Sequence, residues 1–144
     1  MNAMNRNALN AYAQVSVNGT VASASPHKLI TMLFEGALLS IAAARGHMQR
    51  KEIAAKGMAI SKAIAIIDEG LRISLDMKAG GDLAEKLDAL YEYMSHRLLV
   101  ANMKNETAPL DEIAGLLNEL KDAWIQIDPK QTPSQQNTPS APPQ

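Results

Sequence analysis

The chain has 144 residues, of which 47% are hydrophobic, 20% charged and only 3% aromatic, and its formal net charge is -1. This is the length of one domain, and a nearly balanced, unsegregated charge gives no concentrated positive field for a nucleic-acid backbone or an anionic lipid surface. Without cysteine there is no disulfide framework and no thiolate ligand for zinc, which suits a reducing compartment. No apolar run approaches the roughly 18 residues of a membrane span, and the polar start MNAMNRNALNAY is not a secretory signal. We therefore expect a cytoplasmic protein with no nucleic-acid partner and no membrane insertion.

The N-terminal segment is expected to be a removable cover. Residues 4–15 can form a short amphipathic helix with Leu9, Tyr12 and Val15 on or near one side, although about a dozen residues are marginal as an isolated helix. The small, polar residues 16–25 predict a flexible linker. Such a helix can dock on an apolar groove when no partner is bound and detach when one is. The alternative is a frayed terminus that packs nowhere in particular.

Two helices are predicted next. Ser25 as a cap and Pro26 at the first helical position predict a helix that runs to about Arg50. A second helix is predicted over residues 52–78, ending at the glycine pair of residues 80–81, which is typical of a left-handed C-terminal cap.

The second predicted helix carries more apolar surface than a single core contact needs. At about 100° per residue its apolar positions cover an arc of about 200°, beyond the roughly 100° that faces a core. One stripe of this arc comprises Ile60, Ile64, Ile67, Leu71 and Leu75. Either the helix is central in a compact bundle, or part of this surface forms an exposed groove for a partner.

Two further helices follow. Asp82 and Glu85 are spaced as a capping box, and the apolar positions after them repeat at helical spacing. That seam includes Leu83, Leu87, Leu90, Tyr91, Met94, Leu98 and Ala101. The residues Thr107-Ala108-Pro109 open a fourth helix, which Pro129 ends.

The fold class is therefore all-α, an antiparallel four-helix bundle with a short mobile N-terminal helix and a disordered C-terminal tail. Residues 1–24 are expected to be the cover and linker, and residues 25–127 the bundle. The tail over residues 128–144 is rich in Pro, Gln and Ser and almost free of apolar residues, so we expect it to be disordered.

Catalytic and cofactor signatures are missing from the sequence. No phosphate-binding glycine motif and no GxSxG motif occurs. The histidines His27, His47 and His96 have no spacing typical of a metal site. We expect no enzyme activity, no cofactor and no metal. A phosphotransfer domain with His47 or His96 as the phosphorylated group is an alternative, but neither histidine is followed closely by the lysine-glycine pair that such domains place beside it.

Four ordered runs resemble the flagellar secretion chaperone family FliS. They are SASPHKLITMLFEGAL, AKGMAISKAIAIIDEGL, LDALYEYMSHRLLVAN and LLNELKDAWIQI, and the agreement covers about residues 8–127. The resemblance implies a cytoplasmic four-helix bundle that binds the disordered C-terminal segment of flagellin, prevents premature polymerisation and brings flagellin to the flagellar type III export gate. The proline-rich tail lies outside the resemblance.

The resemblance also implies roles for particular residues. Leu9 and Tyr12 match the family's apolar residue and tyrosine three positions apart, implicated in covering the groove and in docking at the gate, while a second nearby tyrosine is absent. The expected client groove uses surplus apolar positions of the second to fourth helices. The partner-binding candidates are Leu9, Tyr12, Val15, Ile60, Ile64, Ile67, Leu71, Tyr91, Met94 and Leu98. An adaptor for another flagellar client, such as an anti-sigma factor, is the alternative within binding proteins.

Overall fold

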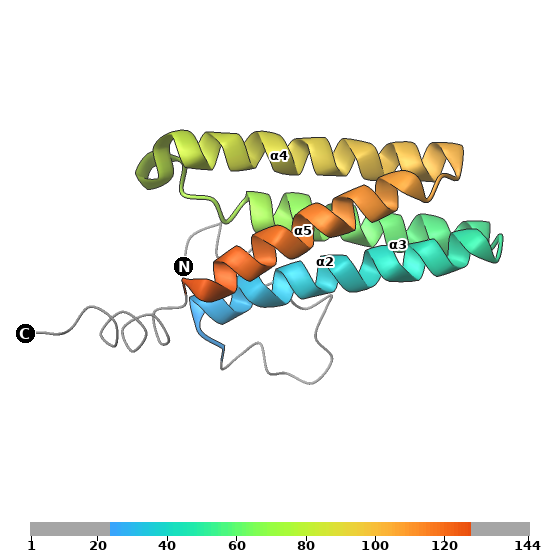
Figure 1. The fold of residues 1–144 in the computed structure, drawn as a ribbon, viewed down its shortest axis with the longest axis horizontal. Coiled ribbons are helices and arrows are strands. Elements are labelled where there is room, and N and C mark those ends of the chain that lie inside the picture. The colour runs from blue at the N-terminus through green and yellow to red at the C-terminus, as the bar shows by residue number, and fades with distance from the viewer. Residues whose placement is uncertain (1–23, 128–144) are drawn as a thin grey trace, which may run out of the picture.

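The computed structural model describes residues 24–127, and all regular structure in this range is helical (Figure 1). The elements in chain order are α2 (Pro26–Gln49), α3 (Ile53–Ile66), the π-helical segment η2 (Ile67–Arg72), α4 (Met77–Lys104) and α5 (Ala108–Gln126). The predicted all-α bundle is confirmed. The predictions for the cover segment and the tail fall almost entirely outside the described residues.

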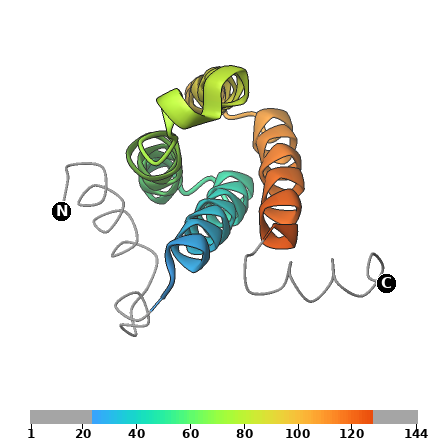
Figure 2. The same cartoon turned by 90° about the vertical axis from the view of Figure 1, so that its left-hand side faces the viewer.

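The helices form an antiparallel ring. Each one reverses the direction of the one before it, and α5 crosses the bundle at a tilt (Figure 1). Viewed from the end, α2 lies between α3 and α5, and α4 closes the ring opposite α2 (Figure 2). Residue contacts join α2 to α3 and α5, and α4 to α3 and α5. The connections between the helices are short, and a short connection makes consecutive helices pack as antiparallel neighbours.

Both predicted proline starts are confirmed. The Ser25 hydroxyl oxygen accepts a hydrogen bond from the backbone nitrogen of Lys28 at 3.1 Å, and Pro26 opens α2. Helix α5 begins at Ala108 with proline in its first turn, although Thr107 makes no side-chain cap bond there. In each case the proline occupies a position where the missing N–H would have had no helical acceptor.

The predicted end of the second helix is wrong. Helix α3 ends at Ile66, widens into η2, and leaves the helical path after Arg72, not near residue 78. A new helical turn starts at Met77 because the carboxylate of Asp76 accepts from the backbone nitrogens of Lys78 and Ala79, at 3.2 and 2.9 Å. Asp76 is therefore the cap of a helical turn that the sequence did not predict. The glycine pair still marks a break, because Gly81 has φ 53° and ψ -132° and kinks α4.

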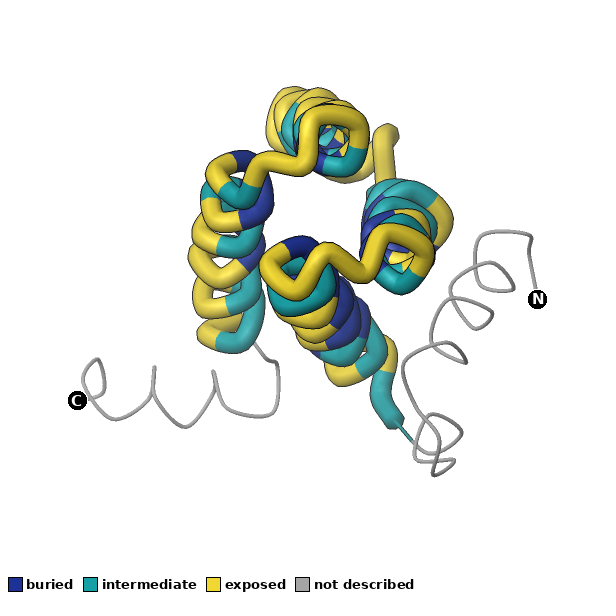
Figure 3. The backbone as a smooth tube through the Cα atoms, turned by 90° about the vertical axis from the view of Figure 1, so that its right-hand side faces the viewer, coloured by how far each residue is buried: buried dark blue, intermediate teal, exposed yellow. Residues whose placement is uncertain are grey.

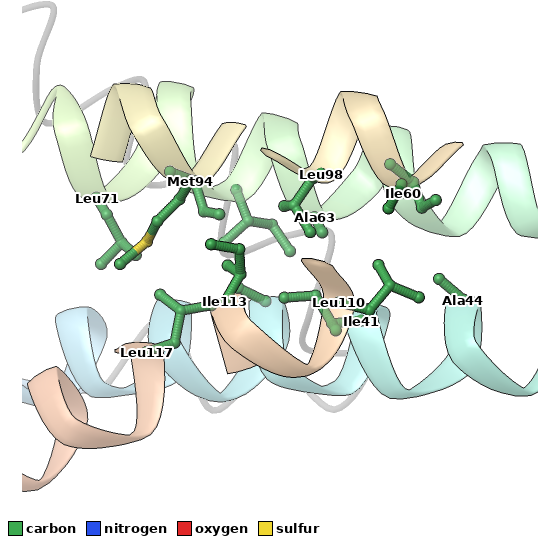
Figure 4. Close-up of a cluster of buried hydrophobic side chains, with 14 of the residues drawn as sticks. Ile41, Ala44, Ile60, Ala63, Leu71, Met94, Leu98, Leu110, Ile113 and Leu117 are labelled. Carbon is green, nitrogen blue, oxygen red and sulfur yellow. The ribbon is translucent and has the colours of Figure 1, made fainter. Parts of the chain in front are cut away.

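The core runs along the axis of the bundle. Buried positions face inward on every helix while the exposed ones face solvent (Figure 3). Ile41 and Ala44 of α2, Ile60 of α3, Leu98 of α4 and side chains of α5 converge in one apolar cluster (Figure 4).

Helix α2 is long and apolar enough to cross a membrane by length and composition alone. In the bundle, 44% of its most apolar window is buried. A core helix of a soluble bundle meets the same criterion, so this composition is accounted for by packing.

A reciprocal clamp joins the start of α2 to the end of α5. The rings of His27 and Trp124 stack with centroids 4.6 Å apart and planes 7° from parallel. The His27 Nε2 atom lies 2.6 Å from the Trp124 carbonyl oxygen, and Trp124 Nε1 donates to the His27 carbonyl at 3.0 Å. These contacts hold the two ends of the described chain together.

Candidate binding groove

An open groove of about 610 Å³ lies between the first half of α3 and the last turns of α4. We name it the α3–α4 groove. Its lining residues are Ile53, Ala54, Gly57, Met58, Ser61 and Asn102. Five of them come from α3 at positions that share one side of a helix, since residues three, four, seven and eight apart are neighbours on its surface.

Small residues on α3 shape the groove. Ala54, Gly57 and Ser61 present little side-chain bulk toward α4. A Cβ atom at Gly57 would still be 4.0 Å from the nearest atom outside its own stretch of helix, Oδ1 of Asn102. The open space beside this glycine lets an apolar chain approach the helix backbone closely.

Large apolar side chains border the groove on both helices. On α3, Ile53 is 59% exposed and Met58 75% exposed. On α4, Leu99 and Met103 are 47% and 70% exposed. Along α4, Leu99 stands three residues before the lining residue Asn102, and Met103 directly follows it. Such a gathering of exposed apolar side chains is typical of a binding surface.

A buried lysine fixes the width of the groove. Lys56 is only 3% exposed, and its Nζ atom donates to the carbonyl oxygen of Asn102 at 2.9 Å and to Oδ1 of Asn105. The ammonium thus sits at the C-terminal end of α4, where the helix dipole favours a positive charge. These bonds tie α3 to α4 beneath the lining residues.

The groove is apolar, whereas the other end of the α3–α4 contact is charged. Arg72 Nε donates to Asp88 Oδ1 at 2.6 Å, and its guanidinium also lies 3.9 Å from Asp68 and 3.6 Å from Glu92. The hydrogen bond from Arg72 lowers the pKa of the Asp88 carboxyl. Three carboxylates surround one guanidinium, so this end of the contact offers charged groups, whereas the groove at the other end offers apolar area.

The structure places most of the predicted groove residues in the core. Six of them are at most 4% exposed: Ile60, Ile67, Leu71, Tyr91, Met94 and Leu98. Ile64 is partly buried and packs against the same cluster. Burial raises the pKa of the Tyr91 hydroxyl.

Those side chains do not line the α3–α4 groove, and a partner would reach the buried ones only if the bundle opened. Partner contact by them stays a prediction. Leu9, Tyr12 and Val15 lie outside the described residues, so their roles stay predictions as well.

Sequence reasoning missed the residues that border the groove. Ile53, Met58 and Met103 stand between polar or small neighbours along the chain, and Leu99 is adjacent to the core residue Leu98. The strongest periodic stripe instead indicated the core. The available signal was that large apolar residues also occur on the side of the helix opposite that stripe, where they indicate an exposed apolar surface. Only the pairing of the start of α3 with the end of α4 shows that they meet.

The described histidines are spread over different environments. His47 Nδ1 lies 2.7 Å from Oε1 of Glu52, which also accepts from Arg50, and His96 is exposed on α4. Within residues 24–127, no group of three or more side chains is arranged to hold a metal ion.

Comparison with known proteins assigns the chain to a family. The family model described as flagellar protein FliS matches residues 8–131. The chain belongs to the FliS family. It is 50% identical over 122 residues to the flagellar secretion chaperone FliS of Salmonella typhimurium, covering 85% of this chain and 90% of that protein. It is also 50% identical over 117 residues to the flagellar secretion chaperone FliSB of Pseudomonas aeruginosa, covering 81% and 92%.

More distant FliS proteins preserve the match. The flagellar secretion chaperone FliS of Bacillus subtilis is 34% identical over 121 residues, covering 84% of this chain and 86% of that protein. The predicted resemblance is therefore confirmed. The name FliS denotes a secretion chaperone and not a class of enzyme.

Proposed function

We propose that this FliS protein is a cytoplasmic export chaperone that binds the disordered C-terminal segment of flagellin. Bound flagellin would be prevented from polymerising prematurely and delivered to the flagellar type III export gate. The observation that carries the proposal is the α3–α4 groove, an exposed apolar surface on a protein whose relatives are named flagellar secretion chaperones.

The groove supports a chaperone that works by mass action. Flagellin's terminal segment forms helices when it packs into a filament, so its apolar faces must be shielded in each free subunit. An amphipathic helix laid in an apolar groove buries those faces. Occupation of the segment lowers the concentration of polymerisable flagellin without ATP, since a ligand shifts an equilibrium by its binding free energy alone.

The decisive test compares matched surface variants. Met58→Asp places a carboxylate in the lining of the groove, and Ile53→Asp does so at another lining position. Each should weaken binding of full-length flagellin by at least about tenfold, because an apolar client would bury an unpaired charge. Leu39→Asp is the control, since Leu39 is 70% exposed on α2, outside the groove. Calorimetry of all three variants, with circular dichroism to verify folding, measures the difference. Equal affinity in the groove and control variants would contradict the proposed site.

Client identity is tested with truncated flagellin. Flagellin without its last segment should not bind, whereas the isolated segment should. Retention of an anti-sigma factor instead of flagellin would favour the adaptor alternative.

We propose that Leu9 and Tyr12 help the N-terminal segment to cover the client groove and to dock at the export gate. If the segment only competes with flagellin, Tyr12→Ala should bind flagellin at least as tightly as the parent, because the competing state is weakened. If Tyr12 also docks at the gate, the variant should retain flagellin and yet fail to secrete it. A large loss of flagellin affinity would place Tyr12 in the client site itself.

A further inference from the structure

Methionine is the only sulfur-containing residue in this chain. The chain has no cysteine and eight methionines. Among the described ones, Met94 is 0% and Met48 8% exposed, whereas Met58 is 75%, Met103 70% and Met77 47% exposed. Oxidants reach a thioether only when its sulfur is accessible. These five methionines therefore fall into a protected set and an accessible set.

One of the accessible methionines lines the groove, and another stands next to a lining residue. Met58 lines the groove from α3, and Met103 directly follows the lining residue Asn102 near the end of α4. We propose that Met58 and Met103 form a reversible oxidation site that lowers the affinity of the α3–α4 groove for its apolar client. The proposal rests on the proposed function, in that the groove is taken as the client site.

The chemical step is oxygen transfer from a peroxide. The thioether sulfur donates an electron pair to one oxygen of hydrogen peroxide, the S–O bond forms as the O–O bond breaks, and the second oxygen leaves as water after proton transfer. The sulfur is oxidised by two electrons and the peroxide is reduced by two. Methionine sulfoxide reductases reverse the change.

Oxidation alters the surface where binding needs apolar area. A sulfoxide is a strong hydrogen-bond acceptor that must be desolvated under an apolar client. Ser61 and Asn102 are the polar side chains of the lining, so few donors are available to satisfy a buried sulfoxide. A sulfoxide at Met58, in the lining, and one at Met103, next to Asn102, therefore both oppose burial of an apolar client there.

Met77 supplies an internal control. It is accessible, but it starts α4, whereas Met103 lies in the last turn of that helix. The helix after Gly81 alone separates the two by about 30 Å. Oxidation at Met77 should leave the groove unchanged.

The first experiment maps reactivity in the folded, full-length chain. Limited treatment with hydrogen peroxide, followed by peptide mass spectrometry, should oxidise Met58 and Met103 at least about fivefold faster than Met94, in line with exposure. Equal rates at all three would overturn the proposal. A methionine sulfoxide reductase should then restore the unmodified masses.

The second experiment links oxidation to binding. Oxidised parent protein should bind the C-terminal segment of flagellin about tenfold more weakly than untreated protein, the effect of one poorly solvated polar group or more. M58L/M103L should keep its affinity within about threefold after the same treatment, since leucine conserves the volume of methionine without the sulfur. M77L should lose affinity as the parent does.

Binding of an apolar fluorescent dye to each protein, with and without peroxide, gives a readout that needs no flagellin. Loss of dye binding on oxidation of the parent, and its retention by M58L/M103L, would support the oxidation site even if untreated protein failed to bind flagellin. That failure would overturn only the proposed function. Equal loss in M58L/M103L and the parent, with dye or with flagellin, would overturn the oxidation site.

Discussion

At the scale of the residue, the buried ammonium of Lys56 joins the start of α3 to the end of α4. Removing it with Lys56→Met keeps an apolar stem of similar length and deletes the donor to Asn102 and Asn105. We expect the free energy of unfolding to fall by about 1–3 kcal/mol, because a buried carbonyl loses its charged partner. Urea unfolding followed by circular dichroism measures the loss.

Lys62→Met is the matched control, since Lys62 is exposed on the same helix. Its effect should stay within about 0.5 kcal/mol. If Lys56→Met proved as stable as the parent, the cost of burying the ammonium would have to equal the worth of its two bonds.

At the scale of the element, the break in α4 depends on one glycine. Gly81 has φ 53° and ψ -132°, a backbone conformation that L side chains rarely adopt. Gly81→Ala should cost about 1–3 kcal/mol through backbone strain, even though no atom lies within 4 Å of the added Cβ. Gly115→Ala, equally open but inside the regular helix α5, should instead stabilise by roughly 0.5–1 kcal/mol. Thermal unfolding of both variants tests whether backbone strain, and not the space around the added Cβ, determines the change in stability. A gain in stability for Gly81→Ala would contradict this explanation.

The two helix starts marked by proline could be predicted from the sequence because their signals are local. The Ser25-Pro26 start needed no tertiary information. The end of α3 could not be predicted, because the apolar stripe continues to Leu75 while the backbone widens at η2 and turns. There the Ser74 hydroxyl donates to the Gly70 carbonyl at 2.7 Å, and Asp76 starts the next turn. Competing side-chain bonds of this kind override periodicity.

The sequence predicted that an apolar binding surface exists but not which residues form it. An excess of apolar surface on the second helix indicated a binding surface, but its strongest stripe, with Ile60 and Leu71, became core. Which stripe is buried depends on how α3 and α4 pair in space. Periodicity alone cannot determine that pairing.

At the scale of the whole molecule, ion pairs between elements make stability depend on acid. Arg45 lowers the pKa of Asp111, and Arg72 that of Asp88. Hydrogen bonds from Tyr93 and then Arg97 lower the pKa of Glu112. A carboxyl with a lower pKa in the folded state binds fewer protons there than in the unfolded chain, so its stabilisation is present above the unfolded pKa and disappears as pH falls through the folded one.

We therefore expect the urea midpoint to be flat near neutrality and to decline from about pH 5 to about pH 3. Arg72→Gln should lower the midpoint at neutral pH and flatten the decline, because the pKa of Asp88 returns toward its unfolded value. Lys62→Gln should leave the profile unchanged. An equally steep decline in Arg72→Gln would show that this pair contributes nothing to acid sensitivity.

Client binding by the whole molecule should be driven by apolar burial and not by charge. The net charge of -1 gives no strong field for steering, and the residues that line the α3–α4 groove carry no charge. Calorimetry with the flagellin segment should therefore give a negative heat-capacity change and an affinity that varies less than about threefold between 50 and 300 mM salt. The Arg72 network is the competing source of affinity, because its surrounding carboxylates could attract a basic client. Arg72→Gln changes that end of the α3–α4 contact and leaves the groove intact, so it should preserve both the heat-capacity change and the weak salt dependence. A steep loss of affinity with salt that Arg72→Gln alters would move the client site from the groove to the charged end.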